Sequence, residues 1–556
     1  MGGIKLKSGI WMIRGNLQRL SKNGLFRDIL AAVVIFLATS IYFNPLLTQI
    51  DTKVVDNYDG VFIGWVMSSV SEKVVTGGED FWDANIYHPN SNTLAYSGLF
   101  LSDSILSLPI YLIFNDPIVQ VNTALVVSQM LTMLMVFFLL HELTNDRWMS
   151  LALSLVYGFS GMRLNFITHL QVMSVWWLSL SWLALVKLSL KPEKSWVVVW
   201  WMAFLTQSVN SFLPGVFIVF SGLLFVGVSS KLRDNLRVLS KWVVGMGIGV
   251  GLVLLAVVKP YWEVSKEFGY TRPINDAMHF AMNLDDLGKY FWSPALYLVI
   301  LISLIIIIKK KLWRSKWVVV FGLISLLGLT MALGPVLKWS GASIKIPFHI
   351  PLPYSVFYYL VPGFKGFRTP IRWMVLFGMS GVMLSGLGLK DLSKRFKLII
   401  SGLLLAIAIM SLPTLPTYAV PSKADYPREY SWLKNQPDGV MIELPMNSWG
   451  AGEASRQEVI RMLYARQHKK VLINGYSGFT PPPWEELVRE MKRDFPSAEV
   501  ITRLERINVD YIMVHMDEYP EDKAEMFAAE LEKLETEKLI TIKASIGNTI
   551  IYGLDN

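Results

Sequence analysis

Residues 298–333 read LVILISLIIIIKKKLWRSKWVVVFGLISLLGLTMAL, two uninterrupted apolar runs joined by a short, strongly basic loop. Continuous apolar runs predict transmembrane helices, because a membrane β-strand alternates apolar and polar residues over roughly ten positions. The whole chain has this character: 53% of its 556 residues are hydrophobic and 17% are charged, against about 25% charged in soluble proteins. The sequence therefore predicts a polytopic α-helical membrane protein.

Eleven apolar segments are predicted to span the membrane. They lie near residues 29–47, 118–140, 148–162, 170–186, 196–209, 212–228, 242–258, 294–308, 317–334, 371–389 and 397–412. The first segment is too long for a signal-peptide core and lacks a cleavage site of small residues, which predicts an uncleaved span. The basic residues in front of it place the N-terminus in the cytoplasm; these are Lys5, Lys7, Arg14, Arg19, Lys22 and Arg27.

The apolar stretch Phe100–Phe114 decides the topology of everything that follows it. It is short for a span and contains Asp103 and Pro109. If it is not a span, the predicted cytoplasmic segments hold 23 Lys and Arg in 72 residues, and the external segments hold 11 in 149. Counting it as a span reverses this bias, so we expect it to lie along the outer face. The result is eleven spans in the cell (cytoplasmic) membrane and an external C-terminus.

The chain is predicted to have three parts. Residues 1–412 form the membrane domain, with a large first external loop at 49–117, and hold 35 Lys and Arg against 20 Asp and Glu. Residues 413–427 are a stiff proline-rich linker, and residues 428–556 are predicted to form an external α/β domain. Because the basic excess belongs to the membrane domain, it does not indicate nucleic-acid binding.

The predicted external domain shows no recognisable set of catalytic residues. We expect strands at 440–444, 470–473, 511–515 and 549–552, and amphipathic helices at 483–494, 498–506 and 520–538. His468 and His515 flank two of these strands and are interpreted as structural. The chain contains no Cys, which excludes disulfides, thiolate catalysis and Cys-ligated metals.

The first external loop concentrates the acidic residues of the membrane domain, with nine of its 20 carboxylates. Asp56 and Asp59 open this loop directly after the first span, and residues 60–75 follow as a predicted amphipathic interfacial helix. A carboxylate fixed at a membrane surface can act as a general base toward a hydroxyl or an amine. The alternative is that the loop is acidic only because basic residues are kept inside.

These features resemble the GT-C superfamily of polytopic glycosyltransferases, which use lipid-phosphate-linked sugars. Its members have an internal N-terminus and a long first external loop with an acidic motif and two juxtamembrane helices, here residues 60–75 and 100–114. The likeness is greatest to a bacterial and archaeal branch related to protein O-mannosyltransferase-like and aminoarabinose-transferase-like enzymes. The matching motifs are Asp59…Trp65, Phe81–Pro89, Asn92–Ala95, Arg163…Gln171, Phe367–Arg372 and, in the tail, Asn474–Phe479.

The resemblance implies a polyprenyl-phosphate sugar donor and a glycan, lipid or protein acceptor. An acidic residue would deprotonate the acceptor, which attacks the anomeric carbon with inversion while the lipid phosphate leaves. Asp59 would be this base, and Asp56 would orient it or help to bind a divalent cation such as Mg or Mn. Better-known members have an adjacent Asp-Glu pair where this chain has Asp56-x-x-Asp59.

The leaving phosphate requires positive partners on the same side of the membrane. Arg368 and Arg372 stand four residues apart at the outer start of a span, so we expect them to share a helix face, although Pro370 between them limits how far the helix extends toward the loop. We expect both to bind phosphate. The alternative is that both arginines only reach to the membrane interface. Further candidates are Arg163, His169, Trp65, Trp82 and His88, and weaker ones are Arg272, Asp285 and Asp286.

Two functions compete with the glycosyltransferase. A carrier or flippase for lipid-linked precursors would show charged or helix-breaking residues near mid-span in paired, repeat-like positions. Asn210 with Pro214 is the main interruption of that kind, and no matching half is found. The other is a non-catalytic assembly factor for the cell envelope, whose external tail binds a partner. Substitution of Asp59 separates these functions, since only the enzyme should lose turnover while keeping its fold.

Overall fold

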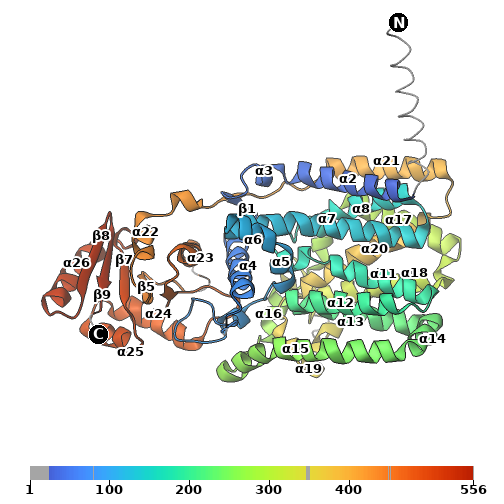
Figure 1. Ribbon diagram of the computed structural model, residues 1–556. Coiled ribbons are helices and arrows are strands. Elements are labelled where there is room, and N and C mark those ends of the chain that lie inside the picture. Colours follow the sequence, from blue (N-terminus) through green and yellow to red (C-terminus); the bar gives the residue numbers. More distant parts are fainter. Residues whose placement is uncertain (1–23, 79, 346–350, 449, 451, 555–556) are drawn as a thin grey trace, which may run out of the picture.

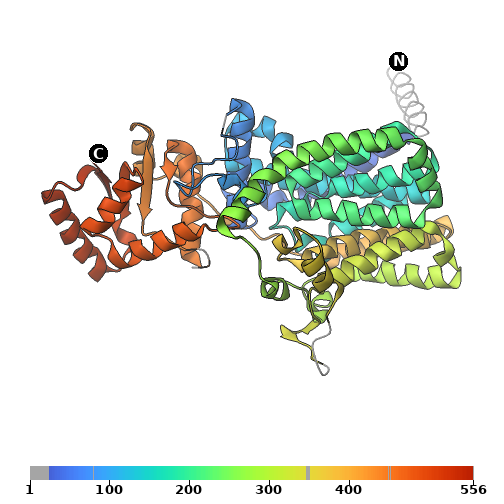
Figure 2. The ribbon, with the colours of Figure 1, turned by 90° about the horizontal axis from the view of Figure 1, so that it is seen from below.

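A computed structural model describes residues 24–78, 80–345, 351–448, 450 and 452–554. Five of the six basic residues before the first span, Lys5 to Lys22, lie outside this range. Long helices form a bundle at one end of the molecule, and a sheet with its helices lies at the other end (Figure 1). Helix α4 (Asp59–Thr76) lies between the two parts and runs across the end of the bundle (Figures 1 and 2).

Each of the eleven predicted spans coincides with a helix of the bundle. These are α2 (Gly24–Tyr42), α7 (Pro117–Thr144), α8 (Arg147–Gly158), α11 (Trp176–Leu190), α12 (Lys194–Asn210), α13 (Phe212–Val228), α15 (Ser240–Phe268), α17 (Pro294–Lys309), α18 (Lys316–Ala332), α20 (Met374–Leu389) and α21 (Lys394–Met410). Among the described residues, five helical segments are long and apolar enough to cross a membrane, or six if α13 and the sharply bent α14 (Ser230–Val238) form one span. The number eleven therefore stays a prediction.

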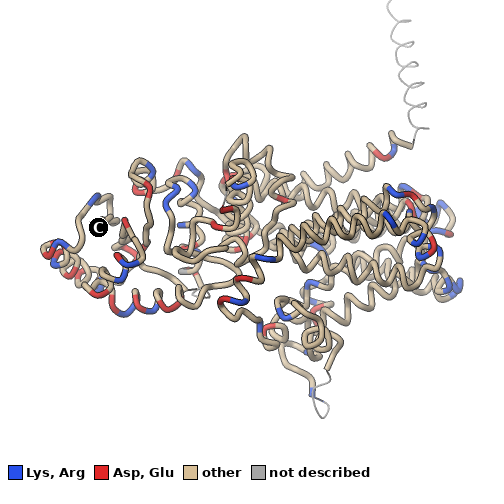
Figure 3. Tube along the Cα trace, turned by 60° about the horizontal axis from the view of Figure 1, so that its bottom comes forward, with Lys and Arg blue, Asp and Glu red and all other residues tan. Residues whose placement is uncertain are grey.

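The bundle presents the apolar exterior of a membrane protein. Helix α15 buries only Val250, Pro260 and Val264 among its 29 residues, all of which are described. Large apolar side chains such as Leu252 and Leu255 point outward along it, which suits a lipid environment. Lys and Arg residues gather at the end of the bundle away from the C-terminal sheet (Figure 3). This separation agrees with the predicted charge bias, and the orientation itself stays a prediction.

Helix α4 differs from the predicted interfacial helix with one exposed face. Every residue from Gly60 to Ser71 is buried, because α7 packs against one side and α23 (Glu453–His468) packs against another. The contact with α7 requires a glycine: a Cβ on Gly64 would lie 2.7 Å from the Pro117 carbonyl oxygen. The second expected juxtamembrane helix, residues 100–114, is divided into two short helices, α5 (Leu101–Leu106) and α6 (Leu108–Phe114). The division occurs because Pro109 lies in the first turn of a new helix.

The C-terminal part contains a five-stranded mixed sheet. Its order is β6 (Val471–Leu472), β5 (Val440–Leu444), β7 (Tyr511–His515), β9 (Thr549–Gly553) and β8 (Thr541–Ile546). Strands β6, β5 and β7 are parallel, and β9 is antiparallel to both of its neighbours. The helices of this part are α22 (Arg428–Lys434), α23, α24 (Pro482–Asp494), α25 (Ala498–Arg506) and α26 (Glu521–Thr536). Strand β8 and helices α22 and α23 were not predicted.

The C-terminal part is joined to the first external loop along the chain and through space. The predicted linker is not free, since its strand β4 (Tyr418–Ala419) pairs with β1 (Lys53–Val54). Residues 85–88 hydrogen bond to the free edge of β6: Leu472 N–H donates to the Asn85 carbonyl at 3.0 Å, and His88 N–H donates to the Leu472 carbonyl at 3.0 Å. We call this contact region, together with α4 and α23, the junction.

Further short elements lie in the loops of the bundle. They include α3 (Asn44–Leu47), α9 (Gly161–Leu164), α10 (Leu170–Met173), α16 (Ile274–His279), β2 (Lys338–Trp339), β3 (Ala342–Ser343), α19 (Pro353–Leu360) and the 3-10 turn η5 (Pro370–Trp373).

Candidate active site

A cavity of about 1190 Å³ lies where the bundle, the first loop and the C-terminal part meet. Its walls come from the start of α4, residues 95–100, the α12–α13 turn, the end of α15, residues 358–369 and the loop 476–479. Five of the candidate residues line it, namely Asp59, His169, Arg272, Arg368 and Arg372. Residues from distant parts of the sequence thus converge on one hollow.

Asp59 is the first residue of α4, where the helix dipole favours a negative charge. The Tyr476 hydroxyl, which also lines the cavity, lowers the pKa of this carboxylate as a hydrogen-bond donor. Burial raises the pKa of Asp59 and nearby Asp56 raises it further, while Arg372 and Arg368 oppose the shift without cancelling it. A carboxylate with a raised pKa is a stronger base than an exposed one.

Asp56 lies behind Asp59 and outside the cavity lining. Its Oδ1 accepts hydrogen bonds from the backbone N–H groups of Tyr58 at 2.9 Å and Gly60 at 3.3 Å, so it fixes the start of α4. Its influence on the site is electrostatic, through the pKa of Asp59. Within the described part of the chain, no group of three or more His, Asp or Glu side chains could hold a metal ion. The divalent cation therefore stays a prediction.

Four cationic side chains line the cavity: Arg272, Lys365, Arg368 and Arg372. The expectation that Arg368 and Arg372 share an α-helical face is wrong, because Pro370 starts the 3-10 turn η5 and α20 begins only at Met374. Arg372 interacts electrostatically with Asp59 and Arg368. Its Nε is buried and has no hydrogen-bond partner among the described residues. A buried, unsatisfied guanidinium nitrogen marks a place for an anionic ligand.

His169 reaches the cavity as a neutral ring. Burial, and secondly the charge of Arg372, lowers its pKa to about 3. Its Nδ1 lies 2.7 Å from the Thr168 hydroxyl, which leaves Nε2 for a ligand. Gln171, two residues further on, also lines the cavity, and its buried Oε1 lacks a partner within the residues that the structure covers. Both side chains can therefore bind a polar, uncharged group.

Arg163 does not line the cavity, contrary to the prediction of a phosphate-binding role. Its buried guanidinium donates to the side chains of Gln129 and Thr132, each at 3.1 Å. It also donates to the carbonyls of Val172, at 3.1 Å, and Met173. These bonds use four of the five guanidinium N–H groups. Arg163 thus fixes the segment that carries His169 and Gln171.

Trp65, Trp82 and His88 also lie outside the cavity lining, so their binding role stays a prediction. Trp65 is buried in the middle of α4. Trp82 packs edge-on against Tyr261 at 5.7 Å, and His88 Nε2 lies 3.1 Å from the Ile507 carbonyl oxygen. Trp65 and His88 thus belong to the junction, whereas Trp82 packs against α15 of the bundle. Asp285 and Asp286 have local partners, an ion pair with Lys289 and the cap of a 3-10 turn.

The prediction missed the contribution of the C-terminal part. Residues 476–479 form one wall of the cavity, although the stretch Asn474–Phe479 had been singled out only as a matching motif. Arg272, a weak candidate, donates to the Gly478 carbonyl. Nothing in the sequence other than its charge indicates that Lys365 lines the cavity. No local pattern in the sequence reveals that this loop reaches Asp59.

No family model matches the sequence, and no curated protein is similar to it in sequence. Its fold is similar to that of the arabinofuranosyltransferase AftD from Mycobacteria, with 13% identity, a TM-score of 0.58, and coverage of 95% of this chain and 40% of AftD. It is also similar to the oligosaccharyltransferase AglB from Archaeoglobus fulgidus, solved with an inhibitory peptide and a dolichol-phosphate. That match has 10% identity and a TM-score of 0.50, and covers 88% of this chain and 69% of AglB. The chain thus spans less than half the length of AftD.

Proposed function

We propose that this chain, which has the GT-C-like fold of membrane glycosyltransferases, transfers a sugar from a polyprenyl-phosphate-linked donor to an acceptor outside the membrane. The observation that carries the proposal is one cavity lined by both Asp59 and Arg372, whose buried Nε has no hydrogen-bond partner among the described residues. The first can accept a proton and the second can bind a phosphate. A glycosyl transfer to a nucleophile needs both groups within reach of one anomeric carbon.

Asp59 acts as the general base of the reaction. It takes the proton of the acceptor hydroxyl or amine, whose lone pair forms a bond to the anomeric carbon. The bond from that carbon to the phosphate oxygen breaks, and the polyprenyl phosphate leaves with the electron pair. Attack from the side opposite the leaving group inverts the anomeric centre. Arg372 and Arg368 stabilise the negative charge that develops on the phosphate.

The apolar part of the cavity suits the lipid of the donor. Val257, Val258 and Trp262 near the end of α15 line it, as do Tyr359 and Leu360 of α19. Trp262, Tyr359 and Leu360 are largely exposed on the outside of the protein. This apolar wall leads from the cationic residues toward the lipid-facing surface of α15, so a polyprenyl chain can remain in the membrane while its phosphate enters the cavity.

Substitution Asp59→Asn tests the proposal, because it keeps the shape of the side chain and removes its basicity. Purified protein is incubated with short-chain polyprenyl-phosphate-linked hexoses and pentoses and a membrane extract as acceptor, and the release of polyprenyl phosphate is measured. We expect a loss of about 10²- to 10⁴-fold, with donor binding largely retained. Asp51→Asn, at an exposed acid of the same loop, is the matched control and should keep wild-type turnover.

Full turnover in the Asp59→Asn variant would remove Asp59 as the base. Equal loss in the Asp51→Asn control would assign the effect to the charge of the loop. A carrier or assembly factor predicts no release of polyprenyl phosphate above background by the wild-type protein itself.

A further inference from the structure

The loop Asn474–Phe479 connects the C-terminal sheet to the wall of the cavity, and Tyr476 lies at its centre. Tyr476 and Asp59 line the same cavity, and the Tyr476 hydroxyl lies close enough to the Asp59 carboxylate to lower its pKa as a hydrogen-bond donor. Its ring packs edge-on against Phe62 at 5.5 Å. Phe62 lies one helical turn after Asp59 on α4, so ring and hydroxyl contact the same face of this helix. Tyr476 is thus held against α4 by two contacts.

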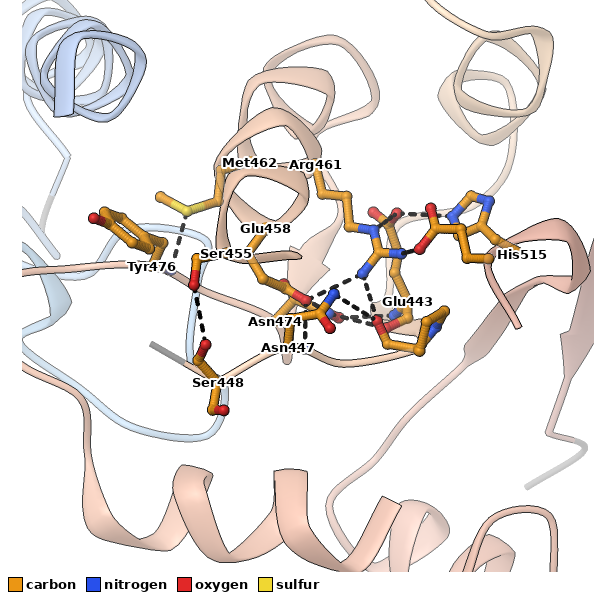
Figure 4. Close-up of polar contacts among 12 residues, drawn as sticks. Glu443, Asn447, Ser448, Ser455, Glu458, Arg461, Met462, Asn474, Tyr476 and His515 are labelled. Carbon is orange, nitrogen blue, oxygen red and sulfur yellow. Dashed lines mark hydrogen bonds and ion pairs between the residues drawn. The ribbon is translucent and has the colours of Figure 1, made fainter. Parts of the chain in front are cut away.

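The first end of the loop is anchored in the C-terminal part through Asn474 (Figure 4). The Asn474 side-chain amide donates to the Glu443 carbonyl at 2.9 Å and to Glu458 Oε2 at 3.0 Å. Its Oδ1 accepts the Glu443 N–H at 2.7 Å. Glu443 and Glu458 are buried and both pair with the buried Arg461, at 3.4 and 3.1 Å. Asn474 is therefore fixed to a cluster that cannot move without breaking buried ion pairs.

The middle and the far end of the loop are also fixed. The Tyr476 N–H points at the Met462 sulfur, 3.1 Å away (Figure 4). Gly475 passes so close to the first loop that a Cβ would lie 2.7 Å from the Tyr87 ring. Phe479 packs against Tyr270 at a centroid distance of 4.4 Å and against Tyr96 at 5.4 Å, both on the bundle side. The position of Tyr476 is thus determined from both parts of the molecule.

We propose that Tyr476 is a positioning residue for the general base, and that the C-terminal part completes the active site by placing its hydroxyl on Asp59. The inference rests on the proposed role of Asp59. A carboxylate that is free to rotate presents its lone pairs in many directions, whereas one fixed by a hydrogen bond keeps the remaining lone pairs aimed at the acceptor.

This role has a consequence for the pH dependence of turnover. A hydrogen-bond donor stabilises the charged carboxylate and lowers its pKa, in opposition to burial and to Asp56. The other groups that face Asp59 are Arg368 and Arg372, which remain in place when Tyr476 is changed. Loss of the hydroxyl therefore raises the pKa of Asp59, and the base is protonated up to a higher pH. The acidic limb of the pH profile moves upward.

The experiment compares Tyr476→Phe with Tyr58→Phe. Tyr58 is the neighbour of Asp59 in sequence, and its hydroxyl donates across the same junction to Glu453 at 3.3 Å. It does not line the cavity, so Tyr58→Phe reports what a lost junction hydrogen bond does by itself. Turnover of a short-chain polyprenyl-phosphate sugar is measured over the pH range in which the wild type titrates, together with the affinity for the polyprenyl phosphate.

In Tyr476→Phe we expect a lower kcat and an acidic limb shifted upward by about one pH unit, the size expected of one charge-assisted hydrogen bond. Affinity for the polyprenyl phosphate should stay near the wild-type value, and Tyr58→Phe should keep the wild-type profile. An unshifted limb in Tyr476→Phe, or an equal shift in Tyr58→Phe, would overturn the positioning role. Full activity of Asp59→Asn would instead remove the base itself, so the two failures are distinguishable.

Discussion

Arg372 allows the sharpest test of phosphate recognition, because its Nε is buried and lacks a partner in the described part of the chain. Replacing it with alanine removes the charge and every donor of the guanidinium. One hydrogen bond to a charged group contributes about 1.5–3 kcal/mol, which corresponds to a loss of affinity on the order of 10- to 10²-fold. The loss should lie toward the upper end if the phosphate binds in a bidentate manner.

Arg372→Lys separates charge from geometry. Lysine keeps the positive charge and loses the planar fork, so the loss of affinity should be smaller than in Arg372→Ala and still measurable. Binding of a polyprenyl phosphate to purified protein is measured at one fixed ionic strength, because surface charges also attract the ligand. Arg314→Ala is the control: Arg314 is exposed and lies in the basic loop between α17 and α18.

Unchanged affinity in Arg372→Ala would refute the reasoning and leave Arg372 as a residue that only reaches to the membrane interface. The pH dependence of turnover is a second measurement that distinguishes this role from a merely structural one. Arg372 lowers the pKa of Asp59 against the effect of burial, so its removal should also move the acidic limb of turnover to higher pH. Weaker binding without this shift would mean that Arg372 binds the donor but does not act on the base.

Two further predictions concern the assembly of the molecule. Glu72 on α4 pairs with Arg466 at 2.6 Å and with Lys469, both of α23 and its end. Glu72→Gln should therefore destabilise the junction by about 1–2 kcal/mol, seen as a lower thermal unfolding temperature, while Glu193→Gln, at an exposed pair with Lys191, should leave it unchanged. For the orientation, single cysteines at Ser91 and Ser431 should react with an impermeant reagent in intact cells and one at Ser315 should not; labelling at position 315 would reverse the proposed sidedness.

The sequence predicts the helices of the bundle well because a membrane leaves an apolar segment few other structures. The number of helices that cross the membrane stays a prediction, since crossing also depends on the tilt and the neighbours of each helix. Helix α23 was missed because it is covered on two sides, by α4 and by α22, so that its apolar residues do not follow one face. Strand β8 was missed because it is an edge strand with several exposed side chains.

The sequence predicted those site residues whose chemical type, acidic or basic, indicates their role. An acid at the start of the first loop and arginines at the start of a span do converge. Arg163 shows the limit of this reasoning: its type and position match those of Arg372, but its donors are already used by the carbonyls and side chains around it. Whether a buried guanidinium is free for a ligand is a property of the folded structure alone.

The motifs of the first loop and of the tail contact each other at the junction. Residues 85–88 hydrogen bond to β6 and to the Asn474 carbonyl, and the same strand leads directly into the loop of Tyr476. The first loop thus contributes Asp59 to the cavity. Some 30 residues later, the same loop contributes residues 85–88, which pair with the strand that leads to Tyr476. A motif residue such as His88 can therefore matter for turnover without touching a substrate, because the pairing it belongs to sets the distance between the carboxylate and the hydroxyl that orients it.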